Sequence, residues 1–138
     1  MSGQAERLER RVFPPPISEE TRRFWEATAR GTLLYGYCNA CREPHYYPRS
    51  TCPFCFSTDV EWKEASGRAV IYTFSVMRRS PTGAYIIAYV TLEEGPSLLT
   101  NVVDSEIDSV KIGAAVELVF KPSEGGPPVP FFKLRPTR

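Results

Sequence analysis

The sequence predicts a mainly β protein with an N-terminal helix, a small metal-binding ribbon and a C-terminal five-stranded barrel. Two Cys-x-x-Cys pairs between residues 38 and 55 predict the ribbon. Five short apolar or alternating segments after residue 67, separated by polar or Gly/Pro-rich breaks, predict the barrel. We divide the chain into a flexible arm (1–13), a helical segment (14–33), the ribbon (34–66) and the barrel domain (67–138).

The charges of the 138-residue chain nearly cancel, with 17 Lys and Arg against 16 Asp and Glu and a formal net charge of +1. Proteins that bind the phosphate backbone usually carry a basic excess, so this balance disfavours nucleic acid. The charged N-terminus lacks the apolar run of a signal peptide, and no segment is apolar for long enough to span a membrane. We therefore expect a cytoplasmic protein whose cysteines stay reduced.

The first ordered element is expected to be a helix over "EETRRFWEATAR". Ser18 is suited to be its N-cap, and Gly31 is placed to end it. Phe24 and Trp25 are adjacent and point about 100° apart, so they need two different environments. The helix therefore either packs on the rest of the chain or docks into a partner.

The cysteine segment "CNACREPHYYPRSTCPFC" is the most specific signal in the sequence. Cys38 and Cys41 form the first pair and Cys52 and Cys55 the second, with ten residues between the pairs. Two such turns, brought together by a short hairpin, make the tetrahedral four-sulfur site that zinc prefers. The strand "TLLYGYC" leads in and "VEWKEASG" leads out, which predicts a zinc ribbon.

Other interpretations of the cysteines remain open. Iron also occupies four-cysteine sites, as in rubredoxin-like proteins, and ligand identity alone does not separate the two metals. A redox pair normally occurs once at the start of a helix, and disulfides suit a secreted chain. His45, the single histidine, is either a polar residue of the ribbon turn or a substitute metal ligand.

The barrel strands are expected at 69–76, 84–92, 97–103, 114–120 and 129–135. In the first of them, alternation puts Val70, Tyr72, Phe74 and Val76 on one face. The segment "DSEIDSVKIG" between the third and fourth strands has a helical or turn-like spacing. Five strands with such an insertion after the third are the layout of an oligonucleotide/oligosaccharide-binding (OB) barrel.

The sequence offers no self-contained catalytic set. The cysteines are assigned to metal, a full tetrathiolate leaves no open coordination position, and no nucleophile elbow or phosphate-cradling glycine loop is present. The absence of a catalytic set therefore favours a binding or assembly role by elimination. A self-standing enzyme that uses loop carboxylates is the minor alternative.

The stretches "RRFWEATARGTLLYGYC", the cysteine segment, "SGRAVIYTF" and "AYIIAYVTLEEGP" together resemble the acyl-CoA-associated OB-fold proteins with an N-terminal rubredoxin-like zinc ribbon. The resemblance covers about residues 14–135. By position, Cys38, Cys41, Cys52 and Cys55 match the metal ligands of that family. The family often has glycine after the second cysteine of each pair, where the turn can need a positive φ; here Arg42 and Phe56 stand there.

The resemblance implies a non-catalytic subunit that handles acyl-CoA and helps to assemble a thiolase-like complex, whose partner subunit carries the catalytic residues. A hetero-oligomer with a structural Zn²⁺ is expected. Arg78 and Arg79, after the first barrel strand, are either contacts for CoA phosphates or a partner's acidic patch, or ordinary solvated loop residues. The alternative is single-stranded nucleic-acid binding, with Tyr72, Phe74, Tyr85 and Tyr89 as stacking platforms.

Overall fold

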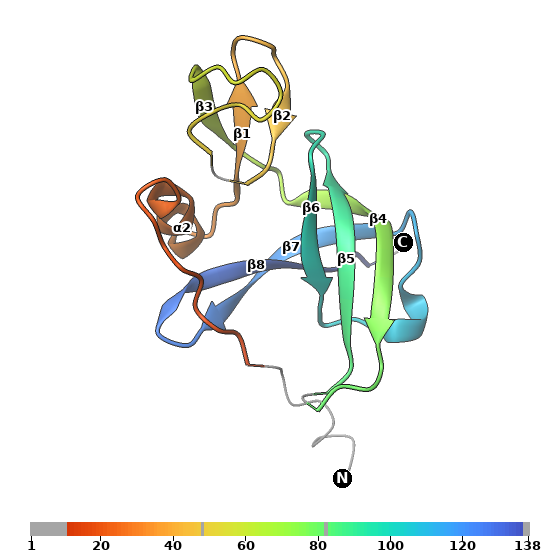
Figure 1. The fold of residues 1–138 in the computed structure, drawn as a ribbon. Coiled ribbons are helices and arrows are strands. Elements are labelled where there is room, and N and C mark those ends of the chain that lie inside the picture. Colours follow the sequence, from red (N-terminus) through yellow and green to blue (C-terminus); the bar gives the residue numbers. More distant parts are fainter. Residues whose placement is uncertain (1–10, 48, 82, 137–138) are drawn as a thin grey trace.

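The structure of the protein is a computed structural model, and it describes residues 11–47, 49–81 and 83–136. Figure 1 shows a small three-stranded sheet beside a larger β-barrel, with one short helix next to both. The elements are α2 (Arg22–Ala29), β1 (Leu34–Cys38), β2 (Pro44–His45), β3 (Val60–Glu64), β4 (Arg68–Met77), β5 (Tyr85–Leu92), β6 (Ser97–Val102), β7 (Ala115–Ser123) and β8 (Gly126–Leu134).

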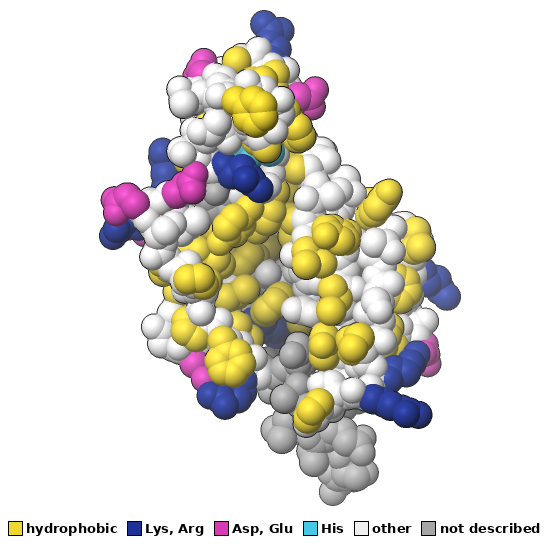
Figure 2. Space-filling model, viewed as in Figure 1, with side chains coloured by type: hydrophobic (Ala, Val, Ile, Leu, Met, Phe, Trp, Pro, Cys, Tyr) yellow, Lys and Arg dark blue, Asp and Glu magenta, His cyan; other side chains and the backbone are white. Residues whose placement is uncertain are grey.

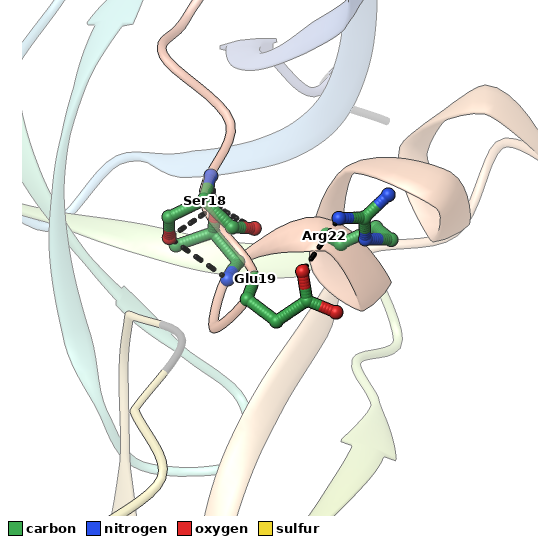
Figure 3. A network of polar contacts seen from close by, with 4 residues as sticks. Ser18, Glu19 and Arg22 are labelled. Atoms are coloured by element: carbon green, nitrogen blue, oxygen red, sulfur yellow. Dashed lines mark hydrogen bonds and ion pairs between the residues drawn. The ribbon is translucent and has the colours of Figure 1, made fainter.

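The helix begins later than the sequence suggests. Its N-cap is Thr21, so the prediction of Ser18 as N-cap is wrong. Ser18 instead closes a separate turn, because its backbone N–H donates to Thr21 Oγ1 at 2.9 Å and its Oγ accepts from the Thr21 N–H at 3.3 Å. Figure 3 shows this turn and the Arg22–Glu19 ion pair beside it, at 2.7 Å.

The end of the helix is as predicted. Gly31 adopts φ 81°, which costs glycine little because it has no Cβ. The Gly31 N–H donates to Thr28 O and the Thr32 N–H to Ala27 O, both at 2.9 Å. These two bonds form a Schellman motif, which satisfies carbonyls that the helix leaves unpaired.

Phe24 and Trp25 do find two environments, and both lie within this chain. Phe24 is fully buried and Trp25 is 6% exposed. Their rings meet edge to face at 4.8 Å, and the Phe24 ring also lies 5.9 Å from Tyr46 of the ribbon. The helix contacts β8 and β1, so intramolecular packing accounts for its two aromatic residues.

The ribbon is an antiparallel sheet in the order β2–β1–β3. β1 pairs with β3 from Leu34 opposite Glu64 to Cys38 opposite Val60. The ribbon meets the barrel at residues 65 and 66, where the Ala65 N–H donates to Leu33 O at 2.8 Å and the Ser66 N–H donates to a carboxylate oxygen of Glu94 at 2.7 Å.

The barrel is closed in the order β4–β5–β6–β8–β7, so the mainly β class and the five-stranded OB barrel are confirmed. Val116 and Phe132 are fully buried at its centre, and the helix residues Phe24 and Ala27 share the same core. A single 3₁₀ turn, Ile107–Ser109, lies between β6 and β7. No helix among the described residues combines the length and apolar character that crossing a bilayer requires.

The alternation predicted along the first barrel strand is wrong at its midpoint. A register shift between Ile71 and Thr73, of the kind a β-bulge makes, inserts an extra residue. Val70 and Tyr72 therefore face solvent, at 45% and 67% exposed, whereas Phe74 packs against the core. One inserted residue moves every later side chain of the strand to the opposite face of the sheet.

Candidate metal centre

The four cysteine sulfurs gather at one point of the ribbon. All four Sγ atoms lie within 4.8 Å of one another. Cys38 Sγ is 3.6 Å from Cys55 Sγ, and Cys41 Sγ is 3.7 Å from Cys52 Sγ. A tetrahedron with metal–sulfur bonds of about 2.3 Å has sulfur–sulfur edges of about 3.8 Å. The cluster therefore has the donor set of a tetrathiolate metal site and is close to its dimensions.

Two equivalent turns position the sulfurs. In the first, the Arg42 N–H donates to Cys38 O at 2.8 Å; in the second, the Phe56 N–H donates to Cys52 O at 3.0 Å. Each turn closes with a left-handed residue, Arg42 at φ 64° and Phe56 at φ 66°. The positions at which the family often has glycine thus do adopt a positive φ in this chain.

The thiols of Cys41 and Cys52 ionise with very different ease. Burial, followed by hydrogen bonds with the thiols of Cys38 and Cys52, raises the pKa of Cys41 to about 12. At Cys52, burial is outweighed chiefly by the amide groups of Cys55 and Phe54, and the pKa falls to about 7. A divalent cation at the centre would favour all four thiolates.

The strained turn yields a test of this geometry. Phe56 is 77% exposed, so replacing it by glycine removes little packing while relieving about 1 kcal/mol of left-handed strain. We expect Phe56→Gly to leave the free energy of unfolding unchanged or to raise it by up to about 1 kcal/mol, measured by urea titration.

The matched control is Phe54→Gly. Phe54 is also exposed, at 61%, and its φ is not positive. Glycine there relieves no strain and should lower the free energy of unfolding by about 0.5–1 kcal/mol. Equal losses in the two variants would contradict the assigned backbone of Phe56.

His45 lies outside the sulfur cluster. It sits on β2 opposite Gly36, is 3% exposed, and neither ring nitrogen has a hydrogen-bond partner among the described residues. Burial, and then the charge of Arg49, lower its pKa, which keeps the imidazole neutral. A Cβ at position 36 would overlap the ring, so glycine and histidine fit each other here. The two-residue strand β2 is too short for an alternating pattern, so the sequence did not indicate that His45 packs against Gly36.

The other candidate residues lie on the barrel, away from the sulfurs. Arg78 and Arg79 are exposed just after β4. Tyr72 and Tyr89 are 67% and 47% exposed, Tyr85 is half-buried, and Phe74 belongs to the core region. Apart from the four cysteines, the described residues contain no group of three or more His, Cys, Asp or Glu placed to hold a metal.

Two family models match the chain in tandem. Residues 25–61 match the ChsH2 rubredoxin-like zinc ribbon domain, and residues 62–121 match the ChsH2 C-terminal OB-fold domain. A "DUF35 domain-containing scaffold protein" of Pyrococcus furiosus is 33% identical over 70% of this chain and 75% of its own length. The chain belongs to the DUF35 family.

Other DUF35 relatives extend this result. A protein of Methanocaldococcus jannaschii with the same description is 33% identical over 72% of this chain and 75% of its own length. A "Probable enoyl-CoA hydratase alpha subunit" of Thermomonospora curvata is 31% identical over 94% of this chain. This DUF35 chain spans only 42% of that relative's length.

A solved DUF35 structure shares the architecture. The chain from the "Ltp2-ChsH2(DUF35) aldolase" superposes with a TM-score of 0.76 and 30% identity, covering 87% of this chain and 98% of that one. The arrangement of helix, ribbon and barrel is therefore that of the DUF35 chain of a two-protein aldolase.

Proposed function

We propose that this chain is a non-catalytic subunit that assembles, and handles acyl-CoA for, a thiolase-like enzyme complex. The likeness to the DUF35 chain of a solved aldolase, at 30% identity over almost all of that chain, is the observation that carries the proposal. Bond making and breaking belong to the partner subunit, an enzyme of the thiolase, acyltransferase or aldolase type.

The metal of this subunit is Zn²⁺ in a structural role. Cys38, Cys41, Cys52 and Cys55 are its ligands in the proposal, supported by their mutual spacing and by the match to a zinc ribbon model. Zinc with four thiolates has no open coordination position, so the ion crosslinks the two turns and takes no part in the reaction. Iron is the alternative occupant of the same donors.

A hollow at the end of the barrel supports the acyl-handling part of the proposal. Its volume is about 770 Å³, and it lies where the N-terminal segment passes β5, β6 and β8. Ligand pockets commonly fall between 300 and about 1,000 Å³. The apolar part of its lining suits an acyl chain and comprises residues such as Phe13, Ile86, Val102, Ile107, Val129 and Phe131, while Arg11, Asp104, Glu106 and Lys121 add charged groups.

The experiment isolates the tagged chain from its native host and identifies every co-purifying protein by mass spectrometry. We expect a thiolase-like chain in stable stoichiometry, and acyl-CoA turnover by the complex but not by the DUF35 chain alone. Recovery of the lone chain, or turnover by the isolated chain, would refute the proposal.

Arg78 and Arg79 are proposed as contacts for the CoA phosphates, supported by their exposure next to one another beyond β4. We expect Arg78→Glu/Arg79→Glu to weaken CoA binding by the complex about tenfold, because two attractive charges become repulsive at a solvated site. Isothermal titration at low and high salt measures the effect. The control, Lys111→Glu/Arg135→Glu, changes the net charge equally at two other exposed positions. Equal affinity in both double variants would remove the two arginines from the site.

Single-stranded nucleic acid is the second candidate, because Tyr72 and Tyr89 are exposed on the OB barrel. Stacking on such residues needs a basic groove to hold the backbone. The net charge of +1 makes binding at physiological salt weak, so we expect no mobility shift with an oligonucleotide.

A further inference from the structure

Three neighbouring barrel strands carry almost no charged side chain, and Arg68, the first residue of β4, is the exception. Residues 69–77 of β4, all of β5 and all of β6 contain no Asp, Glu, Lys or Arg, although 24% of the whole chain is charged. An antiparallel sheet with one solvated face normally alternates apolar inward and polar outward. Solvation alone therefore does not account for the outer face of these strands.

A stripe of large apolar side chains crosses the outer face, beside the smaller polar residues Thr73, Ser75, Thr91 and Ser97. Val70, Tyr72, Tyr89 and Leu99 are 45%, 67%, 47% and 57% exposed. Tyr89 stands directly opposite Leu99 in the ladder, so the stripe is continuous across β5 and β6. The core is already filled from the inner face, by residues such as Val90 and Leu98, so the outer stripe is not needed for folding. Aromatic enrichment without charge is typical of the centre of a protein–protein interface.

A groove adjoins this face along β6. Its volume is about 490 Å³, and Ile87, Leu99 and Asn101 form one wall while Trp25, Tyr46, Tyr47 and Phe131 lie among the others. Leu99 belongs both to the exposed stripe and to the groove. Figure 2 shows hydrophobic side chains on both sides of the hollow between β6 and β8. The face and the groove therefore form one apolar surface.

The groove offers hydrogen bonds as well as apolar contact. Trp25 Nε1 is buried and has no hydrogen-bond partner among the described residues, and an indole N–H can only donate. β6 pairs with β5 along its whole length but is registered with β8 only at Val102 opposite Phe132. A strand edge left open in this way pairs with an extended segment, whose carbonyl groups also suit the indole donor.

The chemistry of this surface selects its occupant. Exposed Arg68, at the start of β4, is the one cation on these three strands, so the surface attracts the phosphates of CoA or of a nucleic acid only weakly. The three strands span a flat area of roughly 400 Å², and the groove extends it toward the roughly 800 Å² per partner of a stable interface. In a symmetric dimer the same patch meets itself, so that groove would face groove and stay unfilled. A different protein with a protruding segment fits both the exposed face and the groove.

We propose that the outer face of β4–β6, together with the groove beside β6, is where the catalytic subunit docks, through a nearly uncharged surface with a central apolar stripe and through an extended segment of the partner that enters the groove. This assignment rests on the proposed function, since it names the docking site of the partner that the function requires. The adjoining acyl hollow shares Tyr85, Asn101, Val129 and Phe131 with the groove, so the docked subunit lies next to it.

The test compares Tyr89→Lys and Leu99→Lys with the control Ile112→Lys, whose residue is also exposed, at 69%, but lies outside the face and the groove. The probe is the purified thiolase-like chain that co-purifies from the host. We expect each face variant to raise the Kd about thirtyfold or more, as loss of a central contact does, and the control to bind like the wild type. Trp25→Phe keeps an aromatic ring in the core and should raise the Kd about threefold to tenfold by removing the donor, with thermal unfolding as the check that the smaller ring leaves the fold intact.

The outcomes separate the two proposals. If no thiolase-like chain co-purifies, the proposed function fails. If the partner co-purifies but the Leu99→Lys variant binds it as the wild type does, only the docking site is wrong. Thermal unfolding checks that this variant is folded. Analytical sedimentation of the chain alone tests whether a second copy of the chain occupies the surface. Dimerisation that Leu99→Lys abolishes would overturn the assignment, and so would oligonucleotide binding that Tyr89→Lys abolishes.

Discussion

Replacing Cys52 by serine is expected to remove tight metal binding and to lower the free energy of unfolding by about 4 kcal/mol or more. Cys52 is buried, its sulfur lies 3.7 Å from that of Cys41, and its carbonyl accepts the bond that closes the second turn. Phe54 and Phe56, the aromatic residues of the second turn, are exposed and do not pack the two turns together. A metal that binds only the folded ribbon therefore contributes its binding free energy directly to folding.

Elemental analysis and urea titration, each with and without a chelator, measure this effect. The control is Thr51→Ser, a conservative change at the adjacent exposed position, which should keep one metal ion per chain. Chelation should reduce the stability of the wild type to that of Cys52→Ser. A metal-free wild type whose folding is indifferent to chelator would refute the metal centre.

Replacing Phe24 by alanine is expected to lower the free energy of unfolding by about 3–5 kcal/mol. Phe24 is fully buried and belongs to the core shared by helix and barrel. Its ring also lies 5.9 Å from Tyr46 and 5.5 Å from Tyr47, which belong to the ribbon. The cavity would therefore lie where helix, ribbon and barrel meet, and no one of them can close it alone.

Urea titration with two reference variants tests this expectation. Phe24→Leu keeps most of the volume and should cost less than about 1.5 kcal/mol. Phe54→Ala removes an exposed ring, at 61% exposure, and should change stability by less than about 0.5 kcal/mol. If Phe24→Ala costs no more than Phe54→Ala, the helix does not pack as described.

Features set by short stretches of chain were predictable. The spacing of Cys38, Cys41, Cys52 and Cys55 predicted one cluster, because each pair is held by its own tight turn. Gly31 predicted the end of the helix, because a left-handed residue is needed there. The five barrel strands lie close to their predicted ranges, since each is a separate run between turn residues.

Features that depend on which partner a side chain chooses, near or far along the chain, were not predictable. The helix start moved from Ser18 because a hydroxyl pair with Thr21 holds a turn in front of it. Residues 1–10 of the predicted flexible arm lie outside the described residues, but Arg11 forms a 2.7 Å ion pair with Glu124, at the other end of the sequence. No local sequence pattern predicts a contact between residues so far apart in the chain.

The sequence by itself determined the class of fold, the metal-binding cluster and the family, because turn chemistry and strand periodicity act over a few residues. Only the tertiary structure decided which apolar side chains became core and which stayed outside. The register shift between Ile71 and Thr73 leaves Val70 and Tyr72 outside although Phe74, beyond it, packs against the core, and the nearly unpaired edge of β6 borders a groove. Both depend on how β4 and β6 pair with other strands, and strand pairing is settled only when the barrel closes.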